Sequence, residues 1–232
     1  MANATTQLFL TGLLMVLKIS ASNPNGGQGL KAAISGRAAG HCKPGSLPIV
    51  TIYFHEKVNV DLRMRARSIF IATRAVRSIG VDLDWRVGTV PPERESFGCG
   101  LAEIIELQVD PTAVPDVSPD ALACATPMRT SGTRIHVFHD RVTEMSALVP
   151  NLLGYVLAHE IGHVLQGVAR HSDEGILKAK WDNRDYGLMA ALALSFSHED
   201  AERIGNHFNR QHEADGVKSD QPGPYRDRIR PL

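Results

Sequence analysis

The sequence has no excess of charge of either sign, since its 232 residues include 25 basic and 25 acidic side chains. Aromatic residues make up only 6% of the chain, and no basic stripe alternates with them. Proteins that bind nucleic acid or an anionic membrane surface usually carry a strongly basic face. We therefore expect neither nucleic acid nor an anionic membrane as a partner.

Cysteine is also scarce, with three residues in the chain. Cys99 and Cys124 lie inside the predicted folded region, and we expect them to form a disulfide if the chain is exported to an oxidising compartment. The alternative is two ordinary buried thiols. The third residue, Cys42, lies near the N-terminus in a segment of different composition.

Long hydrophobic runs are almost absent, and the one that stands out is Leu8–Leu17. This run has the length of a signal-peptide core, is short for a membrane span, and is followed by small residues near Ala21. The basic residue Lys18 follows the run rather than preceding it, so an uncleaved anchor is the alternative. We predict a signal peptide over residues 1–21, a secreted or periplasmic protein, and no stable membrane span after signal removal.

The rest of the chain divides by composition into three parts. Residues 22–46 are rich in Gly, Ala, Ser and Asn and predict a flexible leader. Residues 47–208 are long enough for one well-cored domain. Residues 209–232 are polar and alternate in charge, which predicts a disordered tail.

Hydrophobic periodicity predicts the order strand, helix, strand, strand, strand, helix in the central domain. The crossover through the first helix favours parallel pairing of the first two strands. The sequence thus predicts an α/β (α+β) fold with a twisted mixed sheet of about four strands packed on a backing helix. The expected strands are Leu47–Phe54, Val81–Val87, Leu101–Val109 and Arg134–Val142, and the first helix is Val60–Ile79.

Helix-capping residues mark the C-terminal part. Asp182 and Asp185 have the spacing of a capping box for a helix that runs to Leu194. Ser197 is expected to cap a further short helix, His198–His207.

The most informative stretch is Ala158–His163, which contains an HExxH motif. On a helix, His159 and His163 project from one face and can share a metal ion. Glu160 can accept a proton from a zinc-bound water and return it to a leaving amine. Apolar residues surround the motif at helical spacing, with Asn151 as the expected N-cap and Gly167 as the expected stop. The alternative is a buried helix whose histidines are only hydrogen-bonded core residues.

From His159 the chain reads HEIGHVLQGVARH, which resembles the metzincin branch of the zinc metallopeptidases, with its HExxHxxGxxH motif and Met-containing turn. The chain is also similar to uncharacterised bacterial metzincin-like proteins with the pattern HEIGHxLxGxxxHSxxGIMxAxW, over most of residues 47–208. The resemblance implies a zincin/metzincin-like fold with an active-site HExxH helix and a smaller helical C-terminal part. It also implies a Zn2+ cofactor and a protein or peptide substrate.

The third ligand departs from the family pattern, because His171 lies eight residues after His163 rather than six. Ala169 occupies the usual ligand position and cannot bind a metal. The resemblance implies that His171 is the third ligand, reached by a longer loop. A carboxylate from a later helix is the alternative, and Glu199 and Asp200 are the placed candidates.

A second departure is Leu177, where the similar proteins carry the methionine of the turn below the metal. A leucine of similar volume should keep that hydrophobic floor.

For Cys42 we weigh a thiol without function against a latency switch whose thiolate occupies the open zinc position.

The sequence therefore predicts an exported zinc metalloendopeptidase with His159, His163 and His171 as metal ligands and Glu160 as the catalytic base. The segment Arg134–Val142 is expected to be an edge strand that aligns an extended substrate. The alternatives are a zinc-binding domain without peptidase activity, a hydrolase of a non-peptide amide, and an interaction domain without metal. Nothing in the sequence indicates the oligomeric state.

Overall fold

The computed structural model describes residues 47–90, 104–115, 117–127, 132–146, 149 and 151–214. The predicted signal peptide, the leader with Cys42, and Cys99 lie outside the described residues. Residues 215–232 of the predicted tail also lie outside them.

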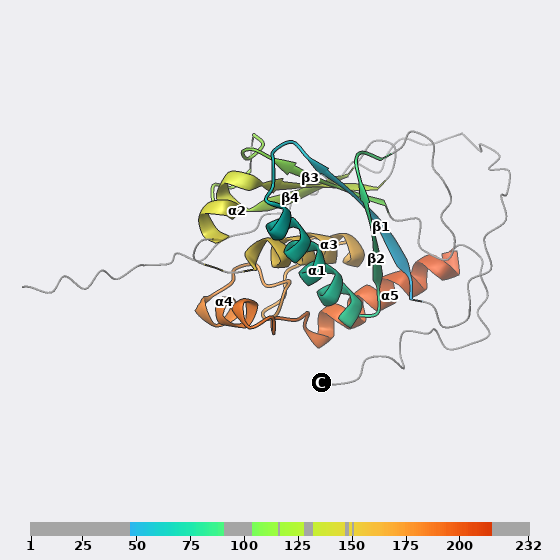
Figure 1. Cartoon of the computed structure of the whole chain (residues 1–232). Helices are drawn as coiled ribbons and strands as arrows, with labels where there is room; N and C mark the ends of the chain where they lie inside the picture. Colours follow the sequence, from blue (N-terminus) through green and yellow to red (C-terminus); the bar gives the residue numbers. More distant parts are fainter. Residues whose placement is uncertain are drawn as a thin grey trace, which may run out of the picture.

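A mixed five-stranded sheet forms one layer of the fold, in the order β2-β1-β3-β5-β4 (Figure 1). β1 pairs in parallel with β2, as predicted, and only β4 runs antiparallel to its neighbour. The α/β class is confirmed, with one strand more than expected. The strands are β1 (Ile49–Glu56), β2 (Asp82–Val87), β3 (Ile104–Asp110), β4 (Ala123–Pro127) and β5 (Thr133–Phe138).

The prediction of an edge strand at Arg134–Val142 is wrong. β5 lies between β3 and β4, and it ends at Phe138, where α2 (His139–Ser146) begins. The short strand β4, which sequence periodicity missed, covers the outer side of β5. Among the described strands, β2 and β4 therefore form the two edges of the sheet.

Two long helices, α1 (Leu62–Ser78) and α3 (Leu152–Gln166), pack together beneath the sheet in Figure 1. Residues of β3 alternate, so that Ile105, Leu107 and Val109 join the main apolar core with residues of both helices. The helices approach closely at Gly154, where an added Cβ would lie 2.6 Å from the Cβ of Ile71. A glycine at this position is therefore what lets α3 sit deep in the core.

The C-terminal part contains α4 (Asn183–Ala190) and α5 (His198–Ala214). The Asp182–Asp185 capping box is confirmed. α4 ends before the predicted Leu194, because Leu192 adopts a left-handed conformation with φ 57°.

Helix α5 is longer than predicted. It continues past His207 to Ala214, so the predicted end of the domain at residue 208 lies inside the helix. The last turns consist mostly of polar residues, and a polar segment without apolar periodicity is easily taken for a tail. None of the described helices combines the length and apolar character needed to cross a membrane.

Candidate metal centre

Helix α3 carries the HExxH motif and is buried along most of its length. Asn151 lies at its N-cap, as predicted, but its side chain makes no capping hydrogen bond. Instead, Asn151 accepts from Arg67 Nε at 3.0 Å and donates to the carbonyl of Met189 at 3.0 Å. Gly167 ends the helix, as predicted, with φ 67° and its N–H 3.2 Å from the carbonyl of His163. The N-cap residue thus ties α3 to α1 and α4.

The three histidines predicted as ligands come together. His159 and His163 lie on α3, and His171 comes from the loop that follows the helix. One nitrogen from each of the three rings lies within 4.8 Å of the others, and the Nε2 atoms of His159 and His163 are 3.0 Å apart. In the described part of the chain, no other group of three His, Cys, Asp or Glu side chains is placed to hold a metal ion.

The orientation of His159 is set by the loop. Its Nδ1 lies 2.7 Å from the carbonyl oxygen of Ile176. Because a carbonyl only accepts, Nδ1 must carry the hydrogen, and in the neutral ring Nε2 then presents a lone pair to the other two histidines. A backbone carbonyl that fixes a histidine tautomer in this way is typical of metal sites.

Burial keeps the three rings neutral. It lowers the pKa of His159 well below its ordinary value, with a further contribution from His163. Burial together with His171 lowers the pKa of His163 to about 3, and burial also lowers the pKa of His171. At neutral pH the cluster therefore offers lone pairs rather than positive charges.

Glu160 is 2% exposed, and its Oε2 has no hydrogen-bond partner among the described residues. Burial raises the pKa of this carboxyl to about 8. A buried, unpartnered carboxyl beside His159 is costly for the fold, and such groups are concentrated at functional sites.

Apolar side chains pack against α3 beside the histidines. Leu177, the predicted floor residue, is fully buried, and its Cδ2 would lie 2.9 Å from a Cβ added at Gly162. The Cε1 atom of Phe196 would lie 2.7 Å from the same position. Trp181 meets His159 edge-on, with ring centroids 5.5 Å apart. Gly162, inside the motif, is thus needed for this close approach of the loop to the helix.

The two carboxylates weighed as alternative ligands are engaged elsewhere. The Oε1 atom of Glu199 lies 2.8 Å from Arg170 Nη2 and 2.7 Å from Arg203 Nη2. Asp200 is fully buried and accepts hydrogen bonds from three side chains, including that of Ser172. Neither carboxylate belongs to the histidine cluster.

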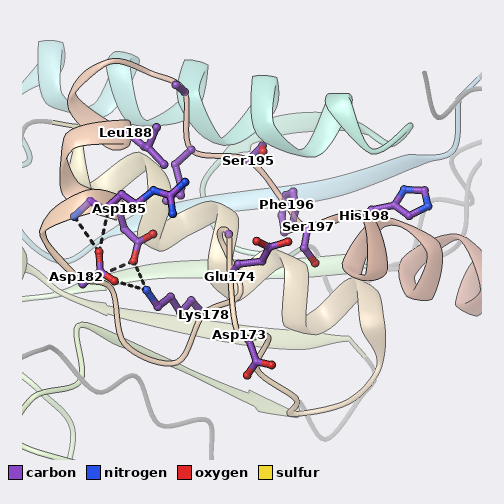
Figure 2. Close-up of a pocket in the computed structure, with 14 residues that line it drawn as sticks. Asp173, Glu174, Lys178, Asp182, Asp185, Leu188, Ser195, Phe196, Ser197 and His198 are labelled. Carbon is purple, nitrogen blue, oxygen red and sulfur yellow. Dashed lines mark hydrogen bonds and ion pairs between the residues drawn. The ribbon is translucent and has the colours of Figure 1, made fainter. Parts of the chain in front are cut away.

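A polar pocket of about 480 Å³ lies between the loop after His171 and α4 (Figure 2). Inside it Lys178 Nζ is 2.6 Å from Asp182 and 2.7 Å from Asp185. These ion pairs fasten the loop to the capping box of α4. Residue spacing predicts the capping box, whereas no signal in the sequence points to the role of Lys178.

Cys124 lies buried in β4, where it packs with Ala121 and Phe138. Its predicted partner, Cys99, is outside the described residues, so the pairing stays a prediction.

No protein-family model matches the chain, and no curated protein matches it. The solved structures that are similar to it include the following two. One is archaemetzincin from Methanopyrus kandleri, at 12% identity and a TM-score of 0.45, covering 72% of this chain and 99% of that one. The other is metalloproteinase-II from Bacteroides fragilis, at 10% identity and a TM-score of 0.42, covering 70% of this chain. The present chain spans about half of the Bacteroides protein, 53% of its length.

Proposed function

We propose that this protein is a zinc-dependent metallopeptidase of the zincin/metzincin type. The observation that carries the proposal is the convergence of His159, His163 and His171, with one nitrogen of each within 4.8 Å of the others, beside the buried carboxyl of Glu160. Three histidine ligands with one open position are the donor set of many catalytic zinc sites.

The donor atoms fit a zinc ion. The Nε2 atom of His171 is buried without a hydrogen-bond partner in the described region, and so is Oε2 of Glu160. Buried polar atoms without partners are rare in proteins, and a bound ion with its water is a common reason for them. Neutral imidazoles are the form that binds zinc, and the low pKa values of these histidines favour that form.

When bound, zinc would act as a Lewis acid and lower the pKa of a water molecule towards 7. The positive charge of the ion would also lower the pKa of Glu160 from its metal-free value of about 8, so that its carboxylate could accept the proton of that water at Oε2 and donate it to the leaving amine. The carbonyl of Ile176 holds His159 in the tautomer needed for binding. Trp181, itself buried, packs edge-on against His159 and shields that ring from bulk water.

The test of this function uses Glu160→Gln, which keeps the size of the side chain and removes its basicity. Wild-type protein should cleave a mixed peptide library, whereas the variant should bind zinc and lose most of the cleavage. If both proteins bind zinc and neither cleaves any peptide, the alternative of a zinc-binding domain or a hydrolase of another amide would be correct. The sites cleaved by the wild type would define its specificity.

We also propose that the protein is exported, on the sequence of residues 1–21 alone. N-terminal sequencing of the mature protein from the secreted or periplasmic fraction should begin near residue 22. Full-length protein retained in the cytoplasm would contradict this proposal.

A further inference from the structure

Asp200 is a carboxylate buried to 0% exposure in the first turn of α5. Burying a charged group is costly unless hydrogen bonds and an opposite charge compensate it. The surroundings of Asp200 supply both, and the groups involved come from three separate parts of the chain.

The two carboxylate oxygens of Asp200 accept hydrogen bonds from different parts of the chain. Oδ1 accepts from the hydroxyl of Ser172 and, at 3.1 Å, from Nε2 of Gln166 in the last turn of α3. Oδ2 accepts from the hydroxyl of Ser197 at 2.7 Å. Arg170 supplies the opposite charge, with Nη1 3.6 Å from Oδ1. Figure 2 shows Ser197 at the entry to α5, between Phe196 and His198.

These contacts converge on the segment around His171. Arg170 and Ser172 are its two chain neighbours, and both interact with the same carboxylate. The N–H of Ser172 also donates to the carbonyl of Leu177 at 2.9 Å. The backbone that carries His171 is thus held on both sides, although it has already left the helix.

We propose that Asp200 is a positioning residue for the metal centre, which holds His171 in place through Ser172 and Arg170. The inference rests on the proposed function, since it assigns Asp200 a task toward the third ligand. It also explains how a histidine two residues beyond the family position can join the cluster. The longer loop is not free, because a buried carboxylate on α5 anchors it to the end of α3.

Asp200 also has a structural role at the start of α5. Asp200 and Ser197 also form a reciprocal cap at the start of α5, since the N–H of Asp200 donates to Ser197 Oγ at 3.1 Å. Removing Asp200 would therefore disturb the helix as well as the loop. Ser172 takes no part in the cap, so Ser172→Ala removes only the hydroxyl that joins the loop to the carboxylate.

The experiment measures zinc affinity by competition with a chelator for the wild type, Ser172→Ala, Asp200→Asn and the reference variant His171→Ala. Glu202→Gln is the matched control, since Glu202 is exposed on the same helix and pairs only with His198 among the described residues. Loss of a group that orients a metal ligand typically weakens binding by about 10- to 100-fold. We expect a loss of this size for Ser172→Ala and Asp200→Asn, and affinity within about twofold of the wild type for Glu202→Gln. The visible spectrum of the cobalt-substituted variants should shift towards that of His171→Ala.

A second readout needs no metal. In zinc-free Ser172→Ala, the amides of Ser172 and Ile176 should exchange their hydrogens faster, while those of α1 should exchange as in the wild type. Wild-type zinc affinity, cobalt spectrum and exchange in Ser172→Ala, beside weakened binding in His171→Ala, would overturn the positioning role alone. A wild-type protein that binds no zinc would overturn the proposed function and this inference with it.

Discussion

Gly162→Ala is the substitution whose effect the packing around the motif defines most sharply. The added methyl would lie 2.7 Å from Phe196 Cε1 and 2.9 Å from Leu177 Cδ2, well inside ordinary van der Waals separation. Such overpacking costs about 1–3 kcal/mol. Alanine regains up to about 1 kcal/mol of helix propensity over glycine. We expect a net loss of about 1 kcal/mol and a melting temperature lower by about 3 °C for a chain of this size.

The displacement should also reach the histidine cluster, because Leu177 adjoins Ile176, whose carbonyl orients His159. Zinc affinity should therefore fall in Gly162→Ala. A loss of about 1.4 kcal/mol in the free energy of zinc binding would make the affinity about tenfold weaker.

The assay is thermal unfolding of the zinc-free protein combined with chelator competition. Gly187→Ala is the matched control, since Gly187 lies inside α4 and an added Cβ there would meet no atom within 4 Å. It should raise stability through helix propensity alone and leave zinc affinity unchanged. If Gly162→Ala is as stable as Gly187→Ala and binds zinc like the wild type, the packing argument is wrong.

Asp182→Asn should lower the melting temperature at pH 6 more than at about pH 2. The hydrogen bond from Lys178 lowers the pKa of Asp182 from 3.8 to about 2, so its stabilisation is present above 3.8 and lost as the pH falls through 2. Gly175→Ala should destabilise the protein in urea by about 1–3 kcal/mol, because φ is 77° there and the Cβ would lie 2.6 Å from the carbonyl oxygen of Ser195; an unchanged midpoint would contradict this. Zinc at about 1,000 times its dissociation constant should stabilise the metal-free protein by about 4 kcal/mol, and a melting temperature insensitive to zinc would exclude a native-state site.

Much of the architecture could be predicted because local signals and the final fold agree. The motif helix consists mostly of apolar residues that are buried, and Gly167 ends it as expected. The parallel pairing of β1 with β2 follows from the helix between them. In the capping box, the side chains of Asp182 and Asp185 each accept a hydrogen bond from the backbone N–H of the other residue. Both bonds lie within four residues, so the capping box can be predicted from spacing alone.

The elements that sequence analysis missed depend on distant partners. β4 consists of Ala123–Pro127, which includes two alanines and a proline, and its pairing with β5 rather than its own propensity makes it a strand. The predicted strand runs on to Val142, but the structure turns after Phe138 into α2, whose first residues His139, Asp140 and Arg141 are polar.

The role of Asp200 could not be found from spacing either. Its partners Gln166 and Ser172 lie 34 and 28 residues away in the chain, and only the packing of α5 against α3 brings them together. The sequence indicates Asp200 only as an alternative metal ligand, and the structure places its carboxylate outside the histidine cluster.

In the zinc site that we propose, His171 is the third histidine ligand, and zinc content after equilibrium dialysis decides whether it binds the ion. We expect one zinc per chain for the wild type at low micromolar free zinc, and a large loss of zinc from His171→Ala under the same conditions. A wild-type protein without zinc, or a His171→Ala variant that retains zinc with wild-type affinity, would contradict it.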